Sequence, residues 1–552
     1  MGAGNDTVTY AGALSTTVGS VGSVAAGTGT ADTIIMTGAQ ADAADASSVF
    51  NTAFTGFEVL QLSNAMTVTV DLDGVNAANK VILAAGSNGG TINNLISGGT
   101  VQINADAAGA LAVGIDGAVS RSTDVLNLNL NKSTLLVANT ITAANVETIN
   151  ITAPDAITAL LATGGTTLLG SAAAINTLGL AATSATSVVV TGNNGLTLTN
   201  TGNVAITNFD ASGVVANDTA ASTFVAATTD TAANLAVTFA STNITAAADV
   251  TIKGGAGNDT LTGTIAKDTI SGNAGIDTIY SDNAGNKTAF ATANVTGTAG
   301  TGTSSAAISF MGLTVDTGTI AAAATNTSAT ETAAAVIAAV NADAVMSKLV
   351  VASGTAPAII FTSLVDGTTA TLPTVVVTQG GVAPTYTAGA ATPGTDGATA
   401  VDVIDGGAGA DVLVGGGGAD TITTGAGADT VFMLKADSVS TALVTITDYT
   451  YAVGGVSNDA LVLGDQTTVI GTTATVQDLS AQTTLALALG VAANTNTVNV
   501  GLSVFIWGGD EYAFVETTGA TTTYQATDTV VKLTGLPLAS GDAIAGAGFD
   551  QV

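Results

Sequence analysis

Three consecutive nonapeptides decide the fold of this chain. They read Gly406-Gly407-Ala408-Gly409-Ala410-Asp411-Val412-Leu413-Val414, Gly415-Gly416-Gly417-Gly418-Ala419-Asp420-Thr421-Ile422-Thr423 and Thr424-Gly425-Ala426-Gly427-Ala428-Asp429-Thr430-Val431-Phe432. Their aspartates, Asp411, Asp420 and Asp429, stand nine residues apart, and Asp402 precedes them at the same spacing. An earlier block repeats this spacing at Asp259, Asp268 and Asp277. This regularity indicates a structural repeat rather than isolated turns.

The residue types at these positions predict calcium binding. Glycines permit positive φ angles and can turn backbone carbonyls inward, and aspartate supplies the hard oxygen ligand that Ca²⁺ prefers. The apolar residue two positions after each aspartate should point into the core of a roll. Because two nonapeptides make one turn, each aspartate should stack over the one 18 residues on. We expect calcium between the stacked pairs Asp259 and Asp277, Asp402 and Asp420, and Asp411 and Asp429.

The predicted calcium ligands are carboxylates and backbone carbonyls of these repeats. They are Asp6, Gly254, Ala256, Asp259, Asp268, Asp277, Asp402, Gly406, Ala408, Asp411, Gly415, Gly417, Asp420 and Asp429. Asp6 belongs to a single copy of the motif, for which an ordinary turn is an equally good interpretation. Thr264 and Ala266 replace glycines around Asp268, which weakens the case for an ion there, and Thr424 is a milder departure.

The charge balance excludes several classes of function. The chain has 41 acidic and 9 basic residues, for a net charge of −32. A basic patch for nucleic acid or an anionic membrane is therefore not expected. Calcium binding and solubility both explain such acidity, and the charge count alone does not separate them.

The absent residue types and the apolar pattern exclude further classes. The chain has no Cys and no His, so zinc sites of thiolate or imidazole, and Ser-His-Asp or Cys-His catalysis, are ruled out. The chain contains no run of 18 apolar residues, so the sequence predicts no membrane-spanning helix. Apolar residues make up 47% and aromatics only 4%, which suits stacked strands with thin layers of small side chains.

The sequence predicts a mainly β protein, an elongated β-solenoid or parallel β-roll, in five segments. Residues 1–250 form a solenoid-like scaffold of short alternating strands, and residues 251–285 form the first calcium-binding block. Residues 286–396 form an inserted α/β module, 397–435 the second block, and 436–552 an aromatic-rich C-terminal β cap.

One helix is expected, at residues 330–340 of the inserted module, where strong helix formers carry an apolar stripe. The module could loop out of one continuous roll, which would bring Asp277 close to Asp402. Trp507 is expected to pack in the core of the cap rather than form a binding patch.

The two blocks resemble the repeats-in-toxin (RTX) family, whose G-G-x-G-x-D-x-U-x units form calcium-bound parallel β-rolls. Segments 56–63, 145–152 and 204–213 resemble strand motifs of large surface-layer proteins of Gram-negative bacteria that carry such repeats, and 524–535 is similar to their C-terminal segment. The resemblance implies type I secretion by an uncleaved C-terminal secretion signal within the cap, residues 436–552. Residues 1–30 have no N-terminal signal pattern, and the opening in mid-motif suggests a fragment of a longer precursor.

Three further acidic sites have weaker patterns. Asp32 looks like a decayed repeat. Asp448 and Asp459 resemble the segment that closes the rolls of the family, with hydrogen bonding as the default role and a further calcium as the alternative. Residues 71–74 resemble the start of a calcium loop, although a turn explains them better.

These observations predict a structural role outside the cell. We expect a calcium-dependent subunit of an extracellular surface layer or filament at the cell surface, whose partners are copies of itself and a cell-surface polysaccharide. The alternative is an RTX-type adhesin with the inserted module as its binding head. We expect no enzymatic activity, because the family's metalloproteases and lipases need histidines that this chain lacks. Catalysis by paired carboxylates, as in glycosidases, stays open among 41 acidic residues, although no pair stands out.

Overall fold

The computed structural model describes two compact units. They are Met1–Leu261 with Asn273–Gly275, and Thr262–Gly272 with Ile276–Val552. The described residues are 1–545 except 13–21, 133, 155–173, 217–229, 244–248, 283–286, 298–303, 312, 321–327, 368–371, 380–382, 393, 395–398, 435–436, 451–458, 465–472, 496–501, 516–522, 527, 536–538 and 541–542. The last residues of the expected secretion signal, 546–552, lie outside them.

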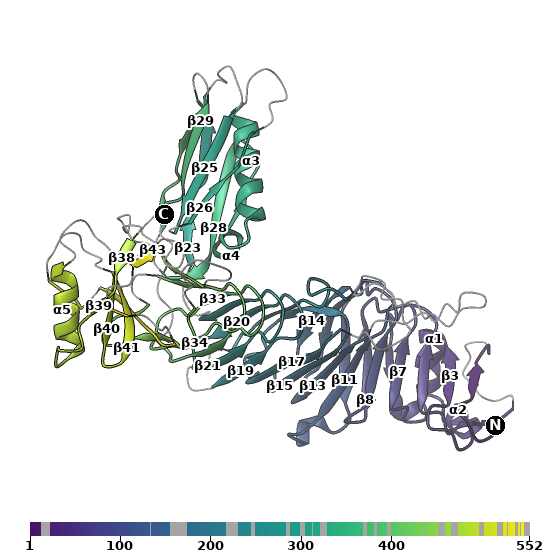
Figure 1. The fold of residues 1–552 in the computed structure, drawn as a ribbon. Helices are drawn as coiled ribbons and strands as arrows, with labels where there is room; N and C mark the ends of the chain where they lie inside the picture. The colour runs from purple at the N-terminus through teal and green to yellow at the C-terminus, as the bar shows by residue number, and fades with distance from the viewer. Residues whose placement is uncertain are drawn as a thin grey trace, which may run out of the picture. The chain divides into compact units, whose positions relative to one another are not determined.

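The first unit consists mainly of two parallel sheets, whose strands are stacked along the unit in Figure 1. One sheet contains β1 (Thr7–Thr9), β3 (Thr33–Met36), β5 (Val59–Leu62), β7 (Lys80–Leu83), β9 (Thr100–Ile103), β11 (Val125–Leu130), β13 (Thr148–Ala153), β15 (Ser187–Gly192), β17 (Asn208–Val214) and β19 (Val250–Lys253). The other contains β6 (Thr69–Asp71), β8 (Gly90–Leu95), β10 (Leu111–Ile115), β12 (Val137–Thr142), β14 (Ile175–Ala181), β16 (Gly195–Asn200) and β18 (Val237–Ala240). The next strand, β20 (Thr260–Thr264), spans the boundary between the units.

From β6 onward the chain alternates between the two sheets, so each coil adds one parallel strand to each sheet. Along β13, Ile149 and Ile151 are buried while Asn150 is half-buried on the outer face, the period-2 pattern of a strand with one side in the core. Phe209 of β17 and Phe239 of β18 stack across the core with ring centroids 3.8 Å apart. The mainly β solenoid expected from the sequence is confirmed.

Short helices of the first unit were not expected from the sequence. Helix α1 (Gly38–Asp45) begins with a capping box between Thr37 and Gln40, and α2 (Ser48–Ala53) begins at Ser47, whose side chain accepts from the amide of Phe50. The expectation of a single helix in the chain is therefore wrong, because caps at the ends of strands can start helices too short to show an apolar period. The remaining short elements are β2 (Val24–Ala25), β4 (Phe54–Thr55), η1 (Leu72–Gly74) and η2 (Ala118–Ser120).

The second unit contains a parallel roll built from the same alternation. One sheet contains β21 (Asp268–Ser271), β32 (Val403–Asp405), β34 (Thr421–Thr423) and β36 (Val444–Ile446), and the other contains β22 (Thr278–Asp282), β33 (Val412–Val414), β35 (Thr430–Met433) and β37 (Ala460–Leu463). The buried positions Ile270, Ile404 and Ile422 share one register across three strands. The apolar residue two positions after each aspartate therefore lies in the core, as its spacing predicts.

The inserted module leaves the roll after β22 and the chain rejoins it at β32 without a break in register. Thr269 pairs with Val403 and Thr278 with Val412, so each strand is followed by a neighbour that comes 134 residues later. Asp277 therefore stacks against Asp411. The neighbour of Asp402 is Asp268, which lies one nonapeptide before the expected Asp277.

The module combines antiparallel strands with one long helix. Helix α3 (Ala329–Ala342) confirms the helix expected at residues 330–340, and it begins with a capping box between Ser328 and Glu331. Its buried Val336 and Val340 belong to a core that also contains Phe432 of the roll. The other elements are β23 (Lys287–Phe290), β24 (Ala293–Thr296), β25 (Ser304–Phe310), β26 (Leu313–Asp316), α4 (Met346–Leu349), β27 (Val350–Ser353), β28 (Ala358–Asp366), β29 (Thr374–Gln379), β30 (Thr385–Thr387) and β31 (Ala391–Thr392).

The C-terminal region extends the sheet of β36 with one parallel strand followed by antiparallel strands. Strand β42 (Thr529–Leu533) pairs with β36, and β41 (Asp510–Val515) and β40 (Leu502–Trp507) follow it. A further helix that was not expected, α5 (Leu485–Thr495), lies against β40. Trp507 packs partly buried against the core of this region, as expected. The remaining strands are β38 (Thr473–Thr475), β39 (Gln477–Asp478) and β43 (Ala543–Ala545).

Candidate metal centre

The aspartates of the second block form a ladder at the turns of the roll. The amide of Asp402 donates to Oδ1 of Asp420 at 2.9 Å, and the amide of Asp411 donates to Oδ1 of Asp429 at 2.8 Å. Each hydrogen bond joins neighbouring coils 18 residues apart. The predicted calcium-binding pairs of this block thus lie against one another.

The ladder continues across the inserted module. The amide of Asp268 donates to Oδ1 of Asp402 at 2.8 Å, and the amide of Asp277 donates to Oδ1 of Asp411 at 2.6 Å. Four carboxylates of the second block therefore each use Oδ1 as a hydrogen-bond acceptor for the preceding coil.

The second carboxylate oxygen of these residues is buried without a hydrogen-bond partner. This holds for Oδ2 of Asp402, Asp411, Asp420 and Asp429, all of which are at most 1% exposed. An unsatisfied buried polar group costs about 1–3 kcal/mol, and more when charged. A cation beside these oxygens would remove that cost.

Burial changes the protonation of these groups when no cation is present. It raises the pKa of Asp411 and Asp429 to about 7 and that of Asp420 to about 8. Desolvation is the main cause in each case, and neighbouring aspartates add repulsion. A bound divalent ion would favour the charged forms of the same carboxylates.

The glycines hold the turns close enough to form a cradle of oxygens. A Cβ at Gly406 would lie 2.4 Å from the carbonyl oxygen of Thr424 and 2.8 Å from Oδ2 of Asp411. Gly425 has a φ of 96°, and a Cβ there would lie 1.9 Å from the carbonyl oxygen of Gly407. Only glycine fits at both places, so backbone and carboxylate oxygens converge at this turn.

The predicted carbonyl ligands of the second block lie in the same turns. Ala408 forms a parallel bridge with Ala426 of the next coil. The carbonyl oxygen of Gly415 accepts from the Ser281 hydroxyl at 2.5 Å, and the amide of Gly417 donates to Oδ2 of Asp282 at 3.0 Å. Each carbonyl oxygen has a second lone pair that can also serve an ion.

Two carboxylates of the first block, those of Asp259 and Asp268, accept hydrogen bonds through both oxygens. Asp268 accepts from the amide of Thr264 through Oδ2 at 2.6 Å, and the Thr264 hydroxyl lies 3.1 and 3.0 Å from its two oxygens. The threonine that replaces a repeat glycine thus supplies hydrogen bonds where the intact repeats have unpartnered oxygens.

Asp259 of the first unit is also satisfied by protein donors. Its two oxygens accept from the amides of Val237 and Gly255, both at 2.6 Å. Among the predicted carbonyl ligands nearby, Gly254 accepts from the Asn273 side chain at 2.8 Å, and Ala256 donates its amide to the Val214 carbonyl at 2.9 Å. Asp259 and Asp277 belong to different units, so the expected calcium between them remains a prediction.

Asp6 and Asp32 form a shorter ladder in the first unit. The amide of Asp6 donates to Oδ1 of Asp32 at 2.7 Å, and the amide of Asp32 donates to Oε2 of Glu58 at 2.9 Å. Asp32 is fully buried, and its Oδ2 has no hydrogen-bond partner. The decayed repeat therefore has the same donor pattern as the second block.

Asp448 and Asp459 act as hydrogen-bond acceptors where the roll continues into the C-terminal region. Asp448 accepts from the amides of Thr424 and Gly425 at 2.7 and 2.9 Å, and Asp459 accepts from the amide of Asp429 at 3.2 Å. Their hydrogen-bonding role is as expected. The turn expected at residues 71–74 is also present, as η1 with Asp71 as its cap.

The sequence analysis did not identify Asp282 as a site residue. It ends β22, is 9% exposed, and its Oδ1 has no hydrogen-bond partner. Burial and the charges of Asp402, Asp420 and Asp437 raise its pKa to about 9. Ser281 and Asp282 fall at the first two positions of a further nonapeptide after Asp277, a phase that could have drawn attention to them.

Within the described residues, no three acidic side chains lie close enough together to hold a metal by themselves. The turns instead offer single carboxylates with surrounding backbone carbonyls, a donor set that suits Ca²⁺. None of the described helices combines the length and apolar character needed to cross a membrane.

Comparison with known proteins identifies the repeats. Residues 249–282 and 396–431 match the RTX calcium-binding nonapeptide repeat, in four copies. No curated protein matches this chain. The RTX repeats bind Ca²⁺, and the buried aspartate ladder has the oxygens to receive it. RTX repeat proteins are typically secreted and fold in a calcium-dependent manner.

Proposed function

We propose that this chain is a calcium-dependent structural subunit of an extracellular surface layer or filament. Inside the cell calcium is scarce, and the net charge of −32 opposes compaction of the repeats. Outside, millimolar calcium exceeds the affinity of about 10⁻⁴–10⁻³ M expected of extracellular modules. Because the ion binds the folded roll, binding drives folding.

The outer face of the first unit supports self-assembly. Its rows of small polar side chains are already ordered by hydrogen bonds between strands: Asn150 Nδ2 donates to Asn127 Oδ1 at 2.9 Å, and Asn208 Nδ2 donates to Ser187 Oγ at 3.0 Å. Only 9% of the chain is charged. Ordered Asn and Thr side chains lose less entropy in a contact than Lys or Glu, which lose up to about 2 kcal/mol each. These faces therefore suit repeated contacts between copies.

The chain's composition supports a structural rather than an enzymatic role. Without His or Cys it lacks the histidine bases and cysteine nucleophiles that many secreted hydrolases use. In this proposal its partners are copies of the same chain, and a cell-surface polysaccharide serves as the anchor.

Electron microscopy with calcium and with EGTA tests the proposal. Ordered sheets or filaments that dissolve with chelator are the expected result. Monomers that fold with calcium and attach to cells or glycans would instead favour an adhesin with the module as its binding head, and would refute the assembly role.

Asn150→Lys provides a sharper test, because it introduces a mobile charge into the outer rows. We expect this variant to fold with calcium, by circular dichroism, but to lose ordered assembly. Thr355→Lys, at an exposed turn of the module, is the matched control and should still assemble. Normal assembly of Asn150→Lys would show that these rows are not the contact surface.

A further inference from the structure

The roll carries an apolar row on the outer face of one of its sheets. Strands β22, β33, β35 and β37 pair in register and bring four side chains into line, Tyr280, Val414, Phe432 and Val462. Leu413 and Val431, which precede two of them, are fully buried in the roll's own core. Because successive side chains of a strand point to opposite faces, the apolar row lies on the side away from that core.

The other sheet of the roll has a polar row at the equivalent place. Strands β21, β32 and β34 align three side chains that are half-buried or exposed, Ser271, Asp405 and Thr423. Every member of both rows stands three residues after an aspartate. The repeats therefore alternate between a polar and an apolar side chain at this position, in step with the alternation of the chain between the two sheets.

The inserted module covers the apolar row. Val414, Phe432 and Val462 are at most 4% exposed. They belong to one hydrophobic core with Val336 of helix α3 and Val365 of β28. The module is therefore packed on the roll through its main core, in addition to its two chain connections.

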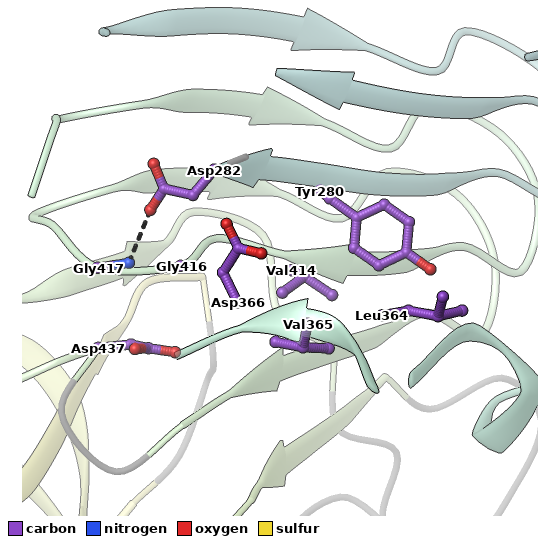
Figure 2. A pocket seen from close by; sticks show the side chains of 9 residues that line it. All are labelled: Tyr280, Asp282, Leu364, Val365, Asp366, Val414, Gly416, Gly417 and Asp437. Atoms are coloured by element: carbon purple, nitrogen blue, oxygen red, sulfur yellow. Dashed lines mark hydrogen bonds between the residues drawn. The ribbon is translucent and has the colours of Figure 1, made fainter. Parts of the chain in front are cut away.

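Strand β28 joins the two parts of this core. It pairs with β23, β24 and β27 in the module, where its Phe361 is buried. Near its end, Val365 is 2% exposed and lines the same small cavity as Val414. Figure 2 shows Val365 of the module next to Val414 of the roll. A second contact comes from β22, where the Tyr280 hydroxyl donates to the carbonyl of Lys348 in α4.

The apolar row forms only when the strands of the roll are in register, and calcium favours that state. Asp411 and Asp429 stand three residues before Val414 and Phe432, and the Oδ2 atom of each aspartate is buried without a hydrogen-bond partner. An ion that satisfies these carboxylates also stabilises the strands that carry the row. Without the ion, the module loses the partner for one side of its core.

We propose that calcium binding by the repeats switches the folding of the inserted module, with the apolar row as the coupling surface. The effect of the ion passes through the packing of Val414 and Phe432 against Val365, so the ion need not touch the module. Because such coupling is reciprocal, the module in turn strengthens calcium binding by the roll. The inference rests on calcium binding by the RTX repeats and not on assembly into a layer or filament.

Hydrogen exchange of the full-length chain with calcium and with EGTA tests the switch. We expect the amides of helix α3 to exchange at least about tenfold faster in EGTA, together with those of β33 and β35. The amides of β11–β17 in the first unit should stay protected in both conditions. Protection of α3 that persists in EGTA, whether or not the roll opens, would show that the module folds by itself and would overturn the proposal. The measurement does not require assembly, so its outcome is separate from that of the electron microscopy.

Val365→Ala tests the reciprocal effect, because it removes apolar contact from the module without changing a predicted calcium ligand. We expect the calcium concentration at which β33 and β35 gain protection to rise about twofold or more, since the cost of the lost packing is shared among several ions. Val188→Ala, at a fully buried position of β15 in the first unit, is the matched control and should leave that concentration unchanged. An unchanged concentration for Val365→Ala would mean that the module and the roll fold independently, contrary to the proposal.

Discussion

The two glycine/aspartate blocks have the same spacing but satisfy their carboxylates in different ways. In the first block, Asp268 accepts hydrogen bonds from the amide and hydroxyl of Thr264. In the second, Oδ2 of Asp411 and Oδ2 of Asp420 are buried without a partner. The Thr264 hydroxyl, at a position where the repeat has glycine, thus adds a hydrogen bond that a glycine cannot make. The second block therefore depends on calcium more strongly than the coil that contains Asp268.

Removal of calcium should have the largest effect, and it should be concentrated in the second block. Four buried carboxylates, each costing about 1–3 kcal/mol when unsatisfied, amount to much of the 5–15 kcal/mol stability typical of a domain. We expect EGTA to expose the amides of β33–β35 to rapid hydrogen exchange while β11–β17 of the first unit stay protected. Uniform loss of protection would contradict this difference between the regions.

Substitution of one ladder aspartate should have the next largest effect. At 10 mM calcium, loss of one ion bound with a Kd of about 10⁻⁴–10⁻³ M lowers the free energy of unfolding by about 1.4–2.7 kcal/mol. We expect this for Asp411→Asn, measured by thermal unfolding with and without calcium. Asp268→Asn should reduce the calcium-dependent part of the stability much less, and equal losses would refute the comparison between the blocks.

The calcium affinity of the folded roll should depend on pH. Burial raises the pKa of Asp411 and Asp429 to about 7 and that of Asp420 to about 8, so the calcium-free fold binds more protons than the unfolded chain between about pH 4 and pH 8. Its stability therefore falls as pH rises through this window, whereas calcium binding to the deprotonated carboxylates strengthens.

We expect the apparent Kd of the folded roll for calcium to rise at least about tenfold between pH 8 and pH 6, because protons compete with the ion for the ladder carboxylates. Isothermal titration at fixed ionic strength, under conditions in which the calcium-free chain is folded, measures it. An apparent Kd that does not change with pH would mean that the ladder carboxylates stay charged without the ion.

Conversion of the first block toward the second should have the smallest effect. Thr264→Gly restores a repeat glycine and removes the hydroxyl that Asp268 uses. We expect a loss of about 1 kcal/mol in EGTA and recovery of that loss in calcium, by denaturant unfolding. Thr269→Gly, at an exposed position of β21, should destabilise the chain equally in both conditions.

Local spacing was enough to predict the roll and its calcium-binding aspartates. A nine-residue repeat combines a glycine turn with a short strand, and both are set by neighbouring residues. The helix at Ala329–Ala342 was also evident, because its length reveals an apolar stripe. Helix α5, at Leu485–Thr495, is Ala- and Leu-rich without a clear polar face, so its sequence alone did not separate it from buried strands.

The amino-acid sequence by itself determined which residues repeat, which side of each strand is buried, and that calcium is the ion. Only the tertiary structure decided which carboxylates face one another across the module. Asp402 meets Asp268, and Asp282 meets the turn of Gly417, because the module folds back on itself and returns the chain in register 134 residues later. No local period encodes that return. It depends on the packing of the module's own core, which brings its two ends to one turn of the roll.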